Sequence, residues 1–112
     1  PEAINGSFVH TNHYLGKEIN AASDPLFFNS RSRMKVALER ASETTDYSLD
    51  TMINILSDRS DDKYPIYRSY LPDDVLQDVG TVATILMDLS AQQFHIRKGN
   101  QPDSPFTTFT VK

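Results

Sequence analysis

The chain has 112 residues, of which 11 are basic and 15 are acidic, so its formal net charge is -4, and 38% of the residues are hydrophobic. This composition predicts an ordinary globular domain with a real core. The acidic balance and the lack of a dense basic cluster argue against a nucleic-acid partner. No apolar run approaches the roughly 20 residues of a membrane span, so a membrane partner is not expected either. The chain contains no cysteine, which excludes a disulfide framework within it and leaves the compartment undecided, with the cytoplasm slightly favoured.

The N-terminal residues have the pattern of a β-hairpin that has lost its first strand. Asn5-Gly6 has the chemistry of a two-residue hairpin turn, and a strand is predicted from about Ser7 to Asn12. Little chain precedes the turn, and Pro1 stands where an initiator methionine would be. We therefore expect residues 1–112 to be either a single domain or the C-terminal portion of a larger one.

Two amphipathic helices are predicted in the first half of the chain. Asp24-Pro25 marks a loop, after which Ser30 caps a helix whose apolar stripe is Met34, Ala37, Leu38 and Ala41. A second helix begins at about Asp46 or Ser48, and its apolar residues are Leu49, Met52, Ile53 and Leu56.

The second half of the chain begins with a long loop over residues 58–80 and then has the pattern of strands. Residues 81–89 are almost continuously apolar and β-branched, which predicts a central strand covered on both faces. A turn at residues 90–92 leads to an alternating strand at 93–97, and a last strand covers 106–111. The order of elements predicts an α+β fold in which helices pack on one face of an antiparallel sheet.

Four segments together resemble one enzyme family: Val9-His10-Thr11-Asn12-His13-Tyr14-Leu15, Asn29-Ser30-Arg31-Ser32-Arg33, residues 80–89, and the terminal Pro105-Phe106. They are similar to the C-terminal portion of the acyl-coenzyme A:6-aminopenicillanic acid acyltransferase family. The members are N-terminal nucleophile hydrolases that act on linear amide carbon–nitrogen bonds and are related to the choloylglycine hydrolases. The resemblance implies that this chain supplies strands and helices to a four-layer αββα sandwich.

The resemblance also implies roles for individual residues. In the family an N-terminal cysteine is both nucleophile and base, and this chain lacks it, so the isolated chain is expected to be inactive. By its place in the motif, Asn12 would stabilise the oxyanion of the tetrahedral intermediate. Arg33, with Arg31 as the alternative, would lie near the nucleophile or bind a substrate carboxylate. Independently of the resemblance, Tyr14 and Tyr67 are the candidate substrate-binding residues, and aromatic packing of the loop that contains Tyr64, Tyr67 and Tyr70 is the favoured alternative for Tyr67.

The resemblance fixes the expected partners as well. They are the upstream portion of the same protein and an amide or acyl-coenzyme A substrate, and cut sheet edges make a homo-oligomer an open alternative. No cofactor is expected. A metal site is not expected either, because His10 and His13 fall on opposite faces of an extended segment.

Two other functions remain open. The chain could be a noncatalytic binding or scaffolding half of the same fold. Less favoured is N-terminal proline chemistry of the tautomerase type, because the turn directly after Pro1 leaves no apolar strand to bury its amine and lower the pKa of that amine.

Overall fold

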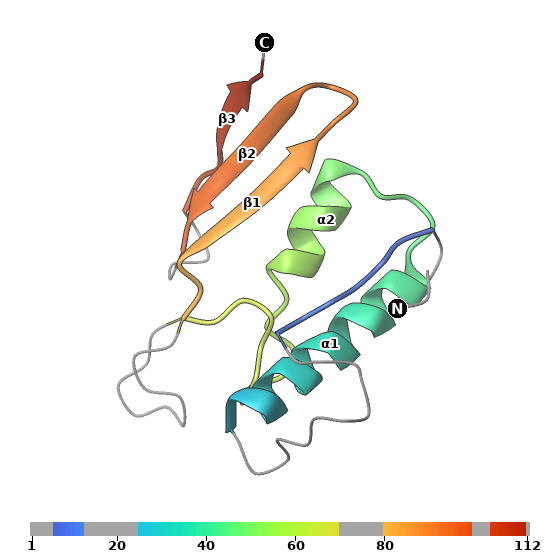
Figure 1. The fold of residues 1–112 in the computed structure, drawn as a ribbon, viewed down its shortest axis with the longest axis vertical. Coiled ribbons are helices and arrows are strands. Elements are labelled where there is room, and N and C mark those ends of the chain that lie inside the picture. Colours follow the sequence, from blue (N-terminus) through green and yellow to red (C-terminus); the bar gives the residue numbers. More distant parts are fainter. Residues whose placement is uncertain (1–5, 13–24, 70–79, 100–103, 112) are drawn as a thin grey trace. The chain divides into compact units, whose positions relative to one another are not determined.

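A computed structural model of the protein describes residues 6–12, 25–69, 80–99 and 104–111. Its elements in chain order are α1 (Pro25–Glu43), α2 (Leu49–Leu56), β1 (Ala83–Asp88), β2 (Gln93–Lys98) and β3 (Thr107–Thr110) (Figure 1). They fall into two compact units, with the helices in residues 1–66 and the strands in residues 67–112. The predicted α+β class is therefore confirmed, while the packing of helices on one face of the sheet stays a prediction. Within the described ranges, no helix is long and apolar enough to cross a membrane.

Helix α1 begins at Pro25, so the prediction that Ser30 caps this helix is wrong. Proline is favoured at the first helical position because its φ is already helical and an N–H at that position would have no intrahelical partner. Ser30 lies inside the helix with only 1% of its surface exposed. At the other end, Arg40 lies in the last turn, where a cation interacts favourably with the helix dipole.

The sequence left two alternatives for the start of helix α2, Asp46 or Ser48, and the structure confirms Ser48. Ser48 is the N-cap, and its side chain accepts a hydrogen bond from the backbone N–H of Thr51 at 3.2 Å. At the other end the N–H of Ser57 donates to the carbonyl oxygen of Ile53 at 2.9 Å. Residues 58–69, which follow, contain neither helix nor strand, in agreement with the predicted loop.

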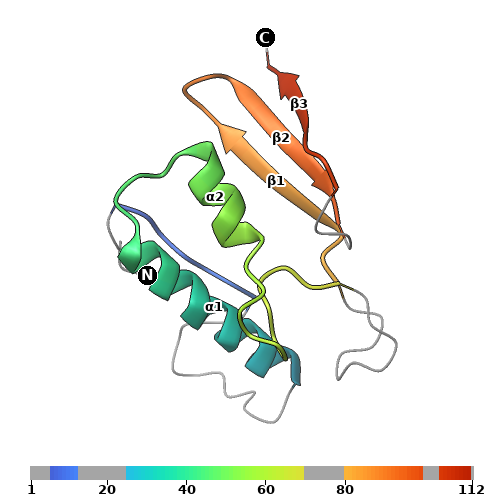
Figure 2. The same cartoon turned by 180° about the vertical axis from the view of Figure 1, so that it is seen from behind.

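The predicted strand from Ser7 to Asn12 is wrong as an element of a sheet. Gly6 lies in a turn with a φ of +79°, but only Ser7 has a β-bridge, and Asn5 lies outside the described residues. The segment instead runs beside α1 in the opposite direction, as Figures 1 and 2 show. Its end bonds to the helix, because the hydroxyl of Thr11 and the N–H of Asn12 donate to Ser30. These polar groups are therefore satisfied by α1.

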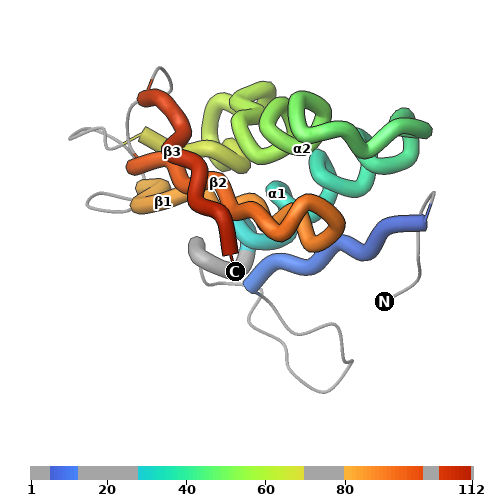
Figure 3. The backbone as a smooth tube through the Cα atoms, turned by 90° about the horizontal axis from the view of Figure 1, so that it is seen from above, coloured from blue at the N-terminus to red at the C-terminus, as the bar shows by residue number. Residues whose placement is uncertain are grey.

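The three strands form an antiparallel sheet in the order β1-β2-β3 (Figure 3). In the register, Ile85 faces Ile96 and Phe94 faces Phe109. The predicted turn at residues 90–92 is confirmed, and Gln92 has a positive φ of 56° there. The prediction that residues 81–89 form the central strand is wrong for the described sheet, because β2 lies between the other two strands.

The sheet has one buried face and one exposed apolar face. Thr84, Leu86, His95 and Arg97 are buried on one side. The other side, which we call the apolar sheet face, consists of Ile85, Met87, Phe94, Ile96 and Phe109. Ile85 is 51% exposed and Met87 is 70% exposed, so the described residues do not cover this side of β1. Cover on both faces of β1 stays a prediction for the complete protein. Hydrophobicity on both sides of a strand predicts burial but cannot tell which molecule or segment supplies the cover.

Candidate functional site

Hydrogen bonds with Ser30 hold the end of the 6–12 segment against the first half of α1. The hydroxyl of Thr11 donates to the carbonyl oxygen of Ser30 at 2.8 Å, and the hydroxyl of Ser30 donates back to Thr11 Oγ1 at 2.9 Å. The backbone N–H of Asn12 donates to Ser30 Oγ at 2.7 Å. Because Ser30 is almost completely buried, this pair of hydroxyls fixes the backbone of Asn12 at the surface of the helix.

The side chain of Asn12 is held by an arginine from the same helix. Arg33 Nη2 donates to Asn12 Oδ1 at 2.7 Å, and Arg33 Nε donates to Asn29 Oδ1 at 3.0 Å. A guanidinium can only donate, so the oxygen of each amide faces Arg33. The NH₂ group of Asn12 therefore lies on the other side of its amide and is a hydrogen-bond donor. We call Asn12, Asn29, Ser30 and Arg33 the Asn12–Arg33 site.

The charge of Arg33 is not cancelled within this site. Burial lowers the pKa of Arg33 from its ordinary value, and no charged side chain of the described residues contributes to that shift. Arginine is not deprotonated in proteins at neutral pH, so Arg33 keeps its positive charge. Its two acceptors among the described residues are neutral amide oxygens. The site therefore combines an oriented amide donor with a cation, an arrangement suited to an anion or to an oxygen that becomes negative during a reaction.

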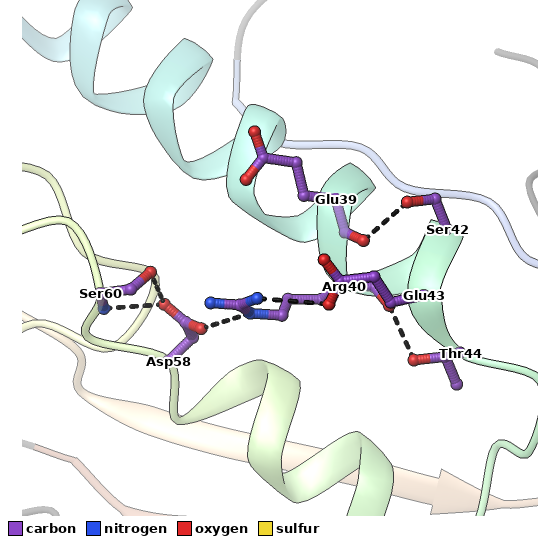
Figure 4. Close-up of polar contacts among 7 residues, drawn as sticks. All are labelled: Glu39, Arg40, Ser42, Glu43, Thr44, Asp58 and Ser60. Carbon is purple, nitrogen blue, oxygen red and sulfur yellow. Dashed lines mark hydrogen bonds and ion pairs between the residues drawn. The ribbon is translucent and has the colours of Figure 1, made fainter.

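A second polar cluster lies at the C-terminal end of α1 and is built differently. Arg40 Nε donates to Asp58 Oδ2 at 2.9 Å, and Arg40 Nη1 lies 3.4 Å from Glu43 Oε2 (Figure 4). The side-chain hydroxyl and the backbone N–H of Ser60 both donate to Asp58 Oδ1. The cluster borders a cavity of about 340 Å³ between α1 and α2. Arg40 is already paired with two carboxylates, so this cluster serves to join α1 to the loop that follows α2.

The strand unit contains a third cluster, around Arg97. Its guanidinium lies over the ring of Tyr67 at 4.6 Å and over the ring of Phe106 at 4.8 Å. It also donates to the hydroxyl of Thr84 at 3.3 Å. Tyr67 is fully buried and Arg97 is 3% exposed, so this stack joins the loop to the buried face of the sheet.

Comparison with known proteins identifies the family of the chain. The family described as acyl-coenzyme A:6-aminopenicillanic acid acyl-transferase matches residues 2–103. The chain belongs to this family. No curated protein and no solved structure matches it. The match includes all four residues of the site as well as β1 and β2, and it ends before β3.

The predicted site residues have different locations. Asn12 and Arg33, which are distant in sequence, are hydrogen-bonded to each other. Arg33 makes this contact, while the alternative, Arg31, has an exposed side chain. Tyr14 lies outside the described residues. Tyr67 is fully buried against Arg97, so its contact with a substrate stays a prediction.

Two site residues, Asn29 and Ser30, had no predicted role in the site. Both belong to the motif that resembles the acyltransferase family, but Ser30 was interpreted as a helix cap. The spacing of Asn29 and Arg33 was the available signal, because residues four apart on a helix are neighbours. Among the described residues, no group of three His, Cys, Asp or Glu side chains is arranged to hold a metal ion.

Proposed function

We propose that this chain is part of an amidase or acyltransferase that cleaves linear amide carbon–nitrogen bonds through an N-terminal cysteine nucleophile. The chain itself contains no cysteine, so the nucleophile would come from outside these residues. The observation that carries the proposal is the hydrogen bond between Arg33 and Asn12 inside the range matched by the family. It joins the two residues to which the family resemblance assigns catalytic roles.

In the proposed reaction the α-amine of the cysteine takes the proton of its own thiol. The thiolate sulfur then forms a bond to the amide carbon, and the electron pair of the C=O double bond moves to oxygen. When this intermediate collapses, the C–N bond breaks and the leaving nitrogen takes the proton from the α-amine. Water or an amine next attacks the carbonyl carbon of the thioester and gives a proton to the α-amine. The C–S bond then breaks and the leaving thiolate takes this proton, which restores the cysteine and completes hydrolysis or acyl transfer.

Asn12 is the proposed donor to the oxyanion. Because its Oδ1 accepts from Arg33, its NH₂ group has a defined direction before the substrate arrives. A donor oriented in advance needs no reorganisation when the negative charge develops, and removal of one such donor costs about 3 to 4 kcal/mol in measured cases. Arg33 would place its positive charge beside the thiolate or bind a carboxylate of the substrate.

We also propose that the complete protein has the four-layer αββα fold. The apolar sheet face supports this proposal, because Ile85, Met87 and Phe109 are about half exposed or more on a single face. A second sheet would bury this face, as in other proteins with stacked sheets. The isolated chain should show no turnover.

The proposal is tested with the full-length gene product and two probes. One is hydrolysis of an acyl amide of 6-aminopenicillanic acid, and the other is acyl transfer from an acyl-coenzyme A to 6-aminopenicillanic acid. Asn12→Ala should lower kcat by about 100-fold to 1,000-fold with little change in KM, because the donor acts in the transition state. Asn54→Ala, at an exposed asparagine of α2, is the matched control.

Intact-mass measurement after thiol alkylation should show that the reactive group is an N-terminal cysteine. Full activity in Asn12→Ala would overturn the role of this residue. A gene product without an alkylatable N-terminal cysteine would remove the mechanism, and a noncatalytic scaffold would become the better reading. Turnover that follows the ionisation of an N-terminal proline would instead support tautomerase chemistry.

A further inference from the structure

Arg33 and Arg40 of helix α1 are held by groups of different charge. Arg40 is bonded to two carboxylates, Asp58 and Glu43, and the hydrogen bond and charge of Asp58 raise the pKa of Arg40. Arg33 is bonded to two amides, Asn12 and Asn29. Among the described residues, carboxylates therefore compensate the charge of Arg40, whereas the acceptors of Arg33 are neutral and leave its charge uncompensated.

The amide at position 29 is the weaker of two nearly isosteric choices for holding an arginine. A carboxylate would accept the same N–H in a charge-assisted hydrogen bond, which is roughly twice as strong as a bond between neutral groups. It would also neutralise the guanidinium. Asn29 is 6% exposed, so water screens a charge at this position poorly.

We propose that Asn29 is a positioning residue that holds Arg33 in place without cancelling its charge, so that the guanidinium acts on an anion at the Asn12–Arg33 site. This inference rests on the proposed function. Asn29 itself does not touch the substrate. Its amide oxygen fixes the Nε edge of the guanidinium, and Arg33 in turn orients the amide of Asn12.

The surroundings of Arg33 agree with this assignment. Its charged neighbours along α1, Arg31 and Lys35, are exposed and have the same sign. His10 on the adjacent segment is also exposed. Within the described residues no carboxylate forms an ion pair with Arg33. An anion that reaches the site would therefore meet a partly desolvated cation, where electrostatic attraction is stronger than in water.

The anion has two possible sources with the same chemistry for Arg33: the thiolate of the proposed nucleophile and a carboxylate of the substrate. The test uses Asn29→Asp in the full-length protein, which changes the charge at position 29 and almost nothing of its shape. The pH dependence of iodoacetamide alkylation of the N-terminal thiol reports on a thiolate. KM for an acyl amide of 6-aminopenicillanic acid, compared with its carboxyl methyl ester, reports on a carboxylate.

If the anion is the thiolate, Asn29→Asp should raise the midpoint pH of alkylation by about one unit, equivalent to a tenfold change. If it is the substrate carboxylate, KM should rise about tenfold for the free acid and stay unchanged for the methyl ester. Either result supports the proposal provided that the melting temperature does not fall. A merely structural Asn29 predicts no change in alkylation pH or in the ratio of the two KM values.

Asp58→Asn is the matched control, because it removes a negative charge beside Arg40 where Asn29→Asp adds one beside Arg33. It should leave the midpoint pH of alkylation and the ratio of the two KM values unchanged. If Asn29→Asp does not fold, the pair Asn29→Gln and Asn29→Glu repeats the comparison with longer side chains that differ only in charge. Strong loss of function in Arg33→Ala together with normal readouts in Asn29→Asp would overturn the assignment of Asn29. Normal function in Arg33→Ala would instead overturn the proposed role of Arg33 in catalysis.

Discussion

The hydroxyl group of Tyr67 is buried without a hydrogen-bond partner among the described residues. Burial of a polar group with no partner costs its desolvation free energy, so Tyr67→Phe should raise the free energy of unfolding by up to about 1 kcal/mol. The ring and its contact with Arg97 would remain. Urea unfolding measures the change, and Tyr47→Phe is the matched control.

The hydroxyl of Tyr47 shares a hydrogen bond with Ser7 Oγ at 3.0 Å and donates to the carbonyl oxygen of Ala41 at 3.3 Å. Tyr47→Phe should therefore lower the free energy of unfolding by about 1 kcal/mol. A comparable loss in Tyr67→Phe would show that the hydroxyl of Tyr67 has a partner in the complete protein. That result would strengthen the prediction that Tyr67 belongs to a binding site.

At the scale of residues, the sequence singled out Asn12 and Arg33, which share a hydrogen bond, but it did not single out the residues that hold them. The first two belong to motifs whose residue types match their proposed chemistry. The roles of Asn29 and Ser30 depend on where α1 begins, since Ser30 bonds the 6–12 segment only as an interior residue of the helix. A serine followed by a helical pattern equally fits a cap, and only the backbone position distinguishes the two roles.

At the scale of elements, Asp58 connects the loop after α2 to the last turn of α1 (Figure 4). Burial alone would raise the pKa of Asp58, but hydrogen bonds from Ser60 and Arg40 and the charge of Arg40 together lower it below its ordinary value. A carboxylate with a lowered pKa stabilises the fold above its unfolded pKa of about 3.9, and this contribution disappears as the pH falls through the folded value.

Asp58→Asn should therefore be less stable than the unaltered protein at neutral pH, and the difference should shrink as the pH falls below about 4. Urea midpoints measured from pH 7 to pH 2 test this expectation. Glu43→Gln is the control, because its contact with Arg40 is longer, at 3.4 Å, and more exposed. A difference between Asp58→Asn and the unaltered protein that stays constant across this range would show that the charge of Asp58 does not stabilise the fold.

Elements with strong local signals were predicted well, and elements that depend on distant partners were not. Helix α2 has both an apolar period and a serine cap, and β2 alternates between buried and less buried residues. The segment from Ser7 to Asn12 has strand-like residues, but its bonding partner is a helix. Strand formation requires a neighbouring strand, and no local pattern specifies whether one is present.

At the scale of the whole molecule, the apolar sheet face distinguishes an isolated domain from part of a larger sandwich. Ile85, Met87 and Phe109 expose more apolar surface than scattered single residues would. The sequence predicted that both sides of β1 are covered, and one side lacks cover within the described residues. The complete protein therefore either buries this face under another layer or leaves it exposed to solvent.

Met87→Glu decides between these alternatives when it is made in the full-length protein. On an exposed face the substitution should change the free energy of unfolding by no more than about 0.5 kcal/mol. Under a second sheet the substitution should lower the free energy of unfolding by more than about 2 kcal/mol, because a carboxylate would be buried without a partner. Val82→Glu is the control, since Val82 is 73% exposed and precedes β1 outside the apolar sheet face. Large destabilisation by Met87→Glu alone would support the four-layer sandwich, whereas equal small effects of both substitutions would contradict it.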